Sequence, residues 1–298
     1  MTTVHYETAR GSFTAGTKAG FPLTLTALSG LSAPGREYKT RSFLGIDGQT
    51  TVSSSVRPRT VTLALERRPD CFLSASEILR ILSSTGTLTI AVDERSFVLT
   101  TNQVAVPDIR RSGDFLLFTA QYVCDEPYFT EPSPRRTVCF EKQKNIRYVG
   151  GVWNLGTRSS PVVWTSTNSK KTIVNDGDAP CEPTIVLVGV GSPSDGASLE
   201  ARIESEDGTI LSQIVLNYAP ADGETVVVNC DGRKEEGRYI RSSKNGDILS
   251  KKSSDTSLSK FRFPVGKSVF RLLYRSESGV LSAYADYAVR YEGVSLWK

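Results

Sequence analysis

Few residues of the chain have the type and spacing that catalysis requires. The sequence holds one histidine, His5, so a Ser–His relay or a metal site built on paired imidazoles has no second ring. Two groups of carboxylates, Asp93-Glu94 and Glu204, Glu206 and Asp207, have the residue types of a glycosidase pair or a calcium site. Both groups fall on turn signals, where acidic residues are well solvated. We interpret them as turn residues, with the glycosidase or calcium site as the alternative.

Two glycine motifs come close to nucleotide-binding sequences. Gly266-Lys267-Ser268 ends like a phosphate-binding loop, but Phe261 stands where that loop has its first glycine. Gly189 and Gly191 begin a dinucleotide-type motif, which Pro193 interrupts where a helix should start. Turns at strand ends explain both motifs, so the sequence predicts no nucleotide cofactor.

The cysteines are odd in number and widely separated. Neither a disulfide framework nor a zinc site has this spacing. We therefore expect reduced, mostly buried thiols, and no metal. The five are Cys71, Cys124, Cys139, Cys181 and Cys230.

Arginine pairs recur in the first half of the chain. Residues 1–136 contain 15 basic and 13 acidic residues, and the whole chain has a formal net charge of +4. This near balance favours arginines that form ion pairs at an interface over a surface that binds nucleic acid, because the planar guanidinium binds carboxylates bidentately. The pairs are Arg57 with Arg59, Arg67-Arg68, Arg110-Arg111 and Arg135-Arg136.

The elements that would position these residues are mostly strands. Apolar and polar residues alternate over 59–65, 87–92, 96–101 and 114–123, with the period of half-buried strands. One segment differs, because Ser74 and Glu77 form a capping-box pattern ahead of apolar residues at helical spacing, and Gly86 can end a helix. We predict one helix over residues 74–85, covering one face of a sheet.

A boundary falls within residues 125–136, where Pro127, Pro132 and Pro134 interrupt both periods. With 298 residues, the chain has room for two ordinary domains. We predict them over 1–134 and 135–298, with one large β-domain as the alternative.

The second half of the chain is also predicted to be β-rich. Six Asp-Gly or Asn-Gly turn signals follow one another closely, and residues 281–291 alternate between apolar and mainly polar positions. This pattern is typical of a β-sandwich or jelly roll. Segment 242–260, rich in serine and lysine, is predicted to be an exposed loop or mobile hairpin.

The sequence shows no signal for export or membrane insertion. No run approaches the roughly 18 apolar residues of a membrane helix, and the first residues lack the order of a signal peptide. We expect synthesis in the cytosol. Trp153, Trp164 and Trp297 could line a sugar-binding face, but the first two lie in apolar runs typical of a core. With no catalytic constellation, the residues favour a structural or binding role.

Segment 118–129 resembles the F-x-C-P-D-P-[YF]-F segment that closes the N-terminal domain of phage distal tail proteins. The family's Pro-Asp pair is replaced here by Asp125-Glu126. Upstream, residues 43–48 are similar to a family turn, and Arg57 and Arg59 lie in a strand similar to the family's R-x-[IV]. The matching residues of segment 118–129 are Phe118, Tyr122, Cys124, Asp125, Pro127, Tyr128 and Phe129.

The resemblance continues through the second half and covers nearly the whole chain. Segments 174–185, 203–210, 223–228 and 263–266 are similar to successive family patterns, in the family's order. Their matching residues include Asn175, Gly177, Pro183, Gly223, Glu224, Pro264 and Gly266.

This resemblance implies a mainly β, non-enzymatic protein of the virion tail tip, or baseplate, assembled in the host cytoplasm. An N-terminal β-barrel or sheet domain with one helix would form a hexameric ring, and a galectin-like β-sandwich would project from it. The ring would bind the tail tube protein and the tail hub or tail-associated lysin, and the tape measure protein is a further expected partner. DNA would pass nonspecifically through its channel, without any cofactor. Two alternatives stay open: a carbohydrate-binding module that attaches a particle to host cell-wall glycans, and a glycan-cleaving enzyme.

Overall fold

A computed structural model describes residues 1–18, 20–42, 49–140, 168–193, 196–233, 236–275 and 280–294. The chain divides into two compact units, of which unit 1 comprises Met1–Ser133 with Arg290–Lys298 and unit 2 comprises Pro134–Val289. The sequence assigned everything after residue 134 to the second domain. In the structure the chain returns to unit 1 at Arg290, because Tyr291 pairs with Phe129 there.

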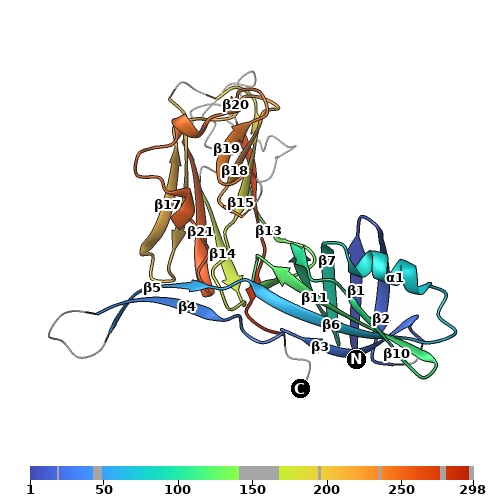
Figure 1. Cartoon of the computed structure of the whole chain (residues 1–298). Coiled ribbons are helices and arrows are strands. Elements are labelled where there is room, and N and C mark those ends of the chain that lie inside the picture. Colours follow the sequence, from blue (N-terminus) through green and yellow to red (C-terminus); the bar gives the residue numbers. More distant parts are fainter. Residues whose placement is uncertain are drawn as a thin grey trace. The chain divides into compact units, whose positions relative to one another are not determined.

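Unit 1 is built on one curled sheet (Figure 1). Its strands follow the order β10-β11-β6-β3-β2-β1-β7-β8-β12-β23. The short strand β9 follows β8 after one residue and pairs with β11, so the sheet turns back toward itself. The bounds are β1 Thr2–Thr8, β2 Gly11–Gly16, β3 Leu23–Ser29, β6 Arg59–Arg67, β7 Gly86–Val92, β8 Arg95–Thr101, β9 Gln103–Val104, β10 Asp108–Ser112, β11 Phe115–Cys124, β12 Phe129–Thr130 and β23 Arg290–Tyr291.

The alternating sequences form the strands that they predict. In β6, Val61, Leu63 and Leu65 are buried while the residues between them are more exposed. The predicted strands 59–65, 87–92, 96–101 and 114–123 are confirmed as β6, β7, β8 and β11. Burying one face of each strand supplies the apolar core of unit 1.

The predicted helix is confirmed as α1 (Ala75–Leu82), and its capping box is present. Ser74 Oγ accepts a hydrogen bond from the Glu77 amide, and the Glu77 carboxylate accepts one from the Ser74 amide. The helix ends earlier than predicted. Gly86 begins β7, where a Cβ atom would lie 2.1 Å from the Glu7 carbonyl oxygen, so this glycine permits close strand pairing and does not end the helix.

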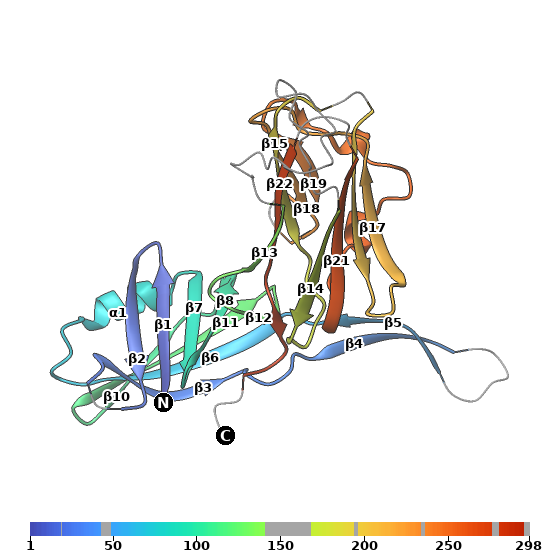
Figure 2. The ribbon, with the colours of Figure 1, turned by 180° about the vertical axis from the view of Figure 1, so that it is seen from behind.

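Unit 2 is a β-sandwich of two sheets, seen in Figures 1 and 2. One sheet has the order β13-β22-β15-β18-β19-β20 and the other β14-β21-β16-β17. This arrangement confirms the mainly β class. The bounds are β13 Arg135–Phe140, β14 Asn168–Asn175, β15 Thr184–Val190, β16 Ser198–Glu204, β17 Ile210–Leu216, β18 Thr225–Asn229, β19 Tyr239–Ser242, β20 Gly246–Asp247, β21 Gly266–Arg275 and β22 Val280–Tyr287, with short 3-10 helices at Leu249–Lys251 and Leu258–Lys260.

Segment 242–260 differs from the exposed loop that its composition predicts. Ile248, Thr256 and Leu258 are buried. The Ser253 amide donates to the Val215 carbonyl (2.9 Å), and Thr256 Oγ1 accepts a hydrogen bond from the Val215 amide (2.8 Å). Part of the segment therefore packs along the edge strand β17, through these buried side chains and hydrogen bonds, while many of its other residues are exposed.

The predicted strand 281–291 is divided in two. β22 ends at Tyr287 in unit 2, and β23 begins at Arg290 in unit 1. Tyr287, Val289 and Tyr291 are all buried, so the alternation persists across the break. A two-residue period shows that one face is covered but not which unit covers it.

Candidate functional site

Three motif residues on β11 belong to the core of unit 1. Phe118, Tyr122 and Cys124 are buried. The Tyr122 ring lies 5.0 Å from the Tyr6 ring, centroid to centroid, and its hydroxyl donates to the Leu82 carbonyl at the end of α1 (3.3 Å). Tyr122 thus joins the helix to the curled sheet, and all three residues have a structural role in the core.

The end of the motif surrounds the buried side chain of Arg59. The Phe129 ring stacks on the guanidinium, with 4.4 Å between Arg59 Cζ and the ring centroid. Arg59 Nε donates to the Pro127 carbonyl at 2.6 Å. Asp125 lies outside this contact, and its amide donates to Asn102 Oδ1 (3.0 Å). Tyr128 is half-buried, with Arg290 Cζ 6.0 Å from its ring centroid.

Arg59 binds backbone carbonyls from three further positions. Its Nη1 donates to Gly30 and Ser32, at 2.5 and 2.6 Å, and its Nη2 donates to Glu292 at 2.5 Å. Gly30, with φ +85°, allows this approach, because a Cβ atom there would lie 2.0 Å from the Thr60 carbonyl oxygen. Burial lowers the pKa of the Arg59 guanidinium, but arginine stays charged at neutral pH. We call Arg59 and its four carbonyl partners the Arg59 clasp.

The C-terminal residues of unit 1 complete the clasp. The Glu292 carboxylate lies 2.6 Å from Arg36 Nη2, and the Val294 amide donates to the Leu31 carbonyl (2.9 Å). The Tyr291 hydroxyl donates to Glu131 (2.9 Å). Segments far apart in the sequence therefore meet around one guanidinium.

A long hairpin leaves unit 1 next to the clasp, and we call it the arm. It consists of β4 (Arg36–Arg41) and β5 (Thr50–Val56), which pair only with each other among the described strands. Every described residue of β4 and β5 is exposed except Val56, which is half-buried. Tyr38 and Val52 are 58% and 66% exposed, although their side chains are largely apolar.

The arm and the β10–β11 hairpin project from opposite ends of unit 1 (Figures 1 and 2). β10 is the last strand at one end of the sheet, and all its residues are exposed. Ile109 and Phe115 of this hairpin are 39% and 40% exposed. Each of the two hairpins thus exposes two apolar or aromatic side chains.

The other predicted arginine pairs find partners within the chain. Arg110 pairs with Asp108 (2.8 Å) and Arg136 with Asp286 (2.7 Å). Arg67 donates to the carbonyl of Leu73 (2.7 Å). Arg57, by contrast, is 62% exposed at the root of the arm, 3.9 Å from Glu37. The sequence did not distinguish Arg59 from these exposed arginines.

The motif residues of unit 2 hold turns together. Asn175 is buried, and its Nδ2 donates to the Ala179 and Phe263 carbonyls while its Oδ1 accepts from the Gly177 amide. Gly266 pairs with Asn175 and has φ +89°. Pro264 follows Phe263 directly, and the Pro183 carbonyl accepts from the Cys230 amide.

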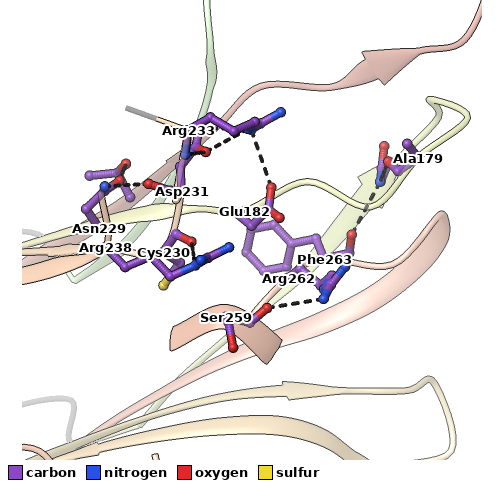
Figure 3. A network of polar contacts seen from close by, with 12 residues as sticks. Ala179, Glu182, Asn229, Cys230, Asp231, Arg233, Arg238, Ser259, Arg262 and Phe263 are labelled. Atoms are coloured by element: carbon purple, nitrogen blue, oxygen red, sulfur yellow. Dashed lines mark hydrogen bonds and ion pairs between the residues drawn. The ribbon is translucent and has the colours of Figure 1, made fainter. Parts of the chain in front are cut away.

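A polar network continues from this turn, as Figure 3 shows. Arg233 lies between Asp231 (2.8 Å) and Glu182 (3.4 Å). Asn229 Nδ2 donates to the Asp231 carbonyl, and Arg238 Nε donates to the Cys230 carbonyl. Burial raises the pKa of Glu182 despite the neighbouring guanidinium. Arg233 is paired with two carboxylates and Arg238 with a backbone carbonyl, which is typical of a structural network.

Glu224 is a second buried residue that gathers several hydrogen bonds. It follows Gly223, a turn residue with positive φ. Its carboxylate accepts hydrogen bonds from the Tyr218 and Ser242 hydroxyls and from the Ala221 amide (2.8 Å). The carboxylate thereby fastens the turn before β18 to the end of β19.

The described residues include no group of three or more His, Cys, Asp or Glu side chains that could hold a metal ion. None of the helices in this part of the chain is long and apolar enough to cross a membrane. The predicted turn at 43–48 and the three tryptophans, Trp153, Trp164 and Trp297, lie outside the described residues.

No family model and no curated protein matches the sequence. Among solved structures, the SPP1 Dit protein, described as a paradigm of the hub adsorption apparatus in phages that infect Gram-positive hosts, is similar with a TM-score of 0.59 and 13% identity. The match covers 98% of this chain and 99% of that chain. A chain of the phage P2 baseplate in its activated conformation with calcium gives a TM-score of 0.46 and 10% identity, over 98% of this chain and 99% of that chain. Along nearly its whole length, the chain therefore has the fold of the SPP1 Dit protein.

Proposed function

We propose that the protein is a structural component of a phage tail tip, in which six copies of unit 1 form a ring. The ring would join the tail tube protein to the tail hub or tail-associated lysin, with the tape measure protein as a further partner. DNA would pass through its channel without sequence-specific contacts, in keeping with the nearly balanced charge of the chain. The virion tail tip is the proposed location.

The exposed arm is the observation that carries this proposal. A two-stranded hairpin on its own is marginally stable in water, because it buries too little apolar surface to offset its ordering. Tyr38 and Val52 leave apolar area exposed on the arm. A second protein surface that covers the arm would supply the missing burial.

The positions of the exposed surfaces favour a ring. Since the arm and the β10–β11 hairpin lie at opposite ends of unit 1, contacts made through them join unlike surfaces of successive copies. Such heterologous contacts close into a ring when the rotation between copies permits. They also cover free sheet edges, which otherwise promote aggregation.

Two half-buried tyrosines of unit 2, Tyr284 and Tyr239, do not favour the carbohydrate-binding alternative. Sugar stacking requires an open ring face, but Arg136 Cζ lies 4.0 Å from the Tyr284 ring centroid and Arg241 Cζ lies 4.6 Å from that of Tyr239. Both half-buried rings thus already carry a guanidinium. The proposal therefore assigns function to contact surfaces and not to a ligand site.

Light scattering over a dilution series, with negative-stain images of the same peak, tests the ring. We expect a mass of six times the 32.5 kDa of one chain, and ring-shaped particles. Val52→Asp should shift the mass toward the monomer, because it replaces an exposed apolar side chain of the arm with a charge. Ser53→Asp is the matched control, because it adds the same charge at a polar position opposite Lys39, and it should assemble. A full-length protein that stays monomeric at every concentration contradicts the ring.

A further inference from the structure

The two strands of the arm lead directly into the Arg59 clasp. β4 begins at Arg36, four residues after Ser32, and β5 ends at Val56, three residues before Arg59. The Arg57 amide donates to the Gly35 carbonyl (2.8 Å), which closes the hairpin at its base. The direction of the arm is therefore set by the groups that hold residues 30–36 and 56–59.

Residues 290–294 supply three of the contacts that hold the base of the arm. The Glu292 carboxylate pairs with Arg36, the Glu292 carbonyl accepts from Arg59, and the Val294 amide donates to Leu31. Arg59 is 3% exposed, so removing one of its acceptors would leave a buried N–H group without a partner. The clasp is complete only when this segment is in place.

Aromatic packing and strand pairing hold the same segment. The Tyr291 ring lies 5.4 Å from the Phe97 ring, edge to face. Phe97 in turn contacts Phe129, the residue that pairs with Tyr291 across β12 and β23. Residues 290–294 thus pack on the core of unit 1, and they form an ion pair and hydrogen bonds with the residues at the base of the arm.

We propose that residues 290–294 are a latch that fixes the direction of the arm, so that a chain presents its arm in one position only after the last strand has docked. All of unit 2 precedes these residues in the chain, so the latch can close only after unit 2 has been synthesised. The latch couples the docking of β23 to the surface that the proposed ring uses. Its role in assembly rests on the proposed function, whereas the coupling itself is a property of one chain.

Hydrogen exchange of the full-length protein, followed by mass spectrometry, tests the latch. In Glu292→Gln the ion pair to Arg36 is lost while the backbone contacts can persist. We expect peptides that cover residues 31–36 and the Arg57 amide to exchange about two- to fivefold faster, the effect of a partly exposed ion pair on local opening. Glu94→Gln, an equal charge change at an exposed turn of unit 1, is the control and should leave these peptides unchanged.

A second variant separates a latch from a general loss of stability. Exchanging the two charges, as Arg36→Glu with Glu292→Arg, should return the exchange rates to those of the wild type. Equal rates in wild type and Glu292→Gln, or no recovery in the exchanged pair, would overturn the latch. A wild-type chain that is always monomeric contradicts the ring and leaves this readout intact, so the two proposals fail separately.

Discussion

Glu224 accepts a hydrogen bond from the Ser242 hydroxyl, which joins the turn before β18 to the end of β19 around one buried carboxylate. Tyr218, Ala221 and Asn245 donate to the same group. Such a carboxylate stabilises the fold only while it is ionised, because all its neighbours act as donors.

Replacing Glu224 by Gln should lower the free energy of unfolding of unit 2 by about 1–3 kcal/mol near neutral pH, since hydrogen bonds to a charged acceptor become weaker neutral ones. Burial raises the pKa of Glu224, but its hydrogen bonds outweigh burial and bring the pKa below its ordinary value of 4.5. The carboxylate therefore stabilises the fold above that value, and the contribution is lost as the pH falls through the lowered pKa. Urea unfolding at several pH values should show the wild-type advantage shrinking in acid. An advantage that is constant with pH contradicts this account, and Glu236→Gln, at an exposed site, is the control.

Arg59→Lys should lower the free energy of unfolding of unit 1 by about 2–4 kcal/mol, because one ammonium group cannot reach carbonyls spread around a planar guanidinium. Thermal unfolding followed by calorimetry measures the loss. Arg57→Lys makes the same change two residues away on an exposed side chain, and it should have little effect. Similar unfolding temperatures for the two variants would mean that the clasp does not stabilise unit 1.

Trypsin should cut the unassembled chain first within the arm, after Lys39 or Arg41, because these residues are exposed on a hairpin with little support. In the assembled ring, the same bonds should be protected. Mass spectrometry of the earliest fragments at low and high protein concentration makes this comparison. Cleavage at equal rates in both states would show that the arm is not covered by assembly.

The buried thiols should not react in the folded protein. Burial raises the pKa of Cys124 to about 11 and that of Cys181 to about 12, so almost no thiolate forms near neutral pH. Iodoacetamide at pH 8 should leave both residues unlabelled until the chain is unfolded. A Ser53→Cys variant supplies an exposed thiol as the positive control. Rapid labelling of either native cysteine would mean that its surroundings open readily.

Local signals in the sequence predicted what local interactions determine. The capping box of Ser74 and Glu77 located the start of α1, because both hydrogen bonds lie within one turn. The alternation of apolar and polar residues located β6 and β11, because successive side chains of a half-buried strand point alternately to the core and away from it. The end of α1 was wrong, since the role of Gly86 depends on a distant strand, β1.

The arm and the clasp could not be predicted in the same way. Thr50–Val56 is exposed on both faces, so no alternation marks it as a strand. From the sequence, Arg59 could not be told apart from exposed arginines. Its hydrogen-bond acceptors are backbone carbonyls, which every residue has, so no residue type in the sequence marks them. Tyr291 continues the alternation of β22 and gives no sign that it has entered another unit.

The pairing of β12 with β23 also bears on how such chains can diversify. Unit 2 is an insertion whose entry and exit lie on adjacent, hydrogen-bonded strands, since Thr130 pairs with Arg290. An inserted domain is tolerated best where its two ends meet at neighbouring positions of the host. The curled sheet could therefore accept a different domain between β12 and β23, provided that the two ends of that domain lie close together. The architecture of the sheet itself would then stay the same.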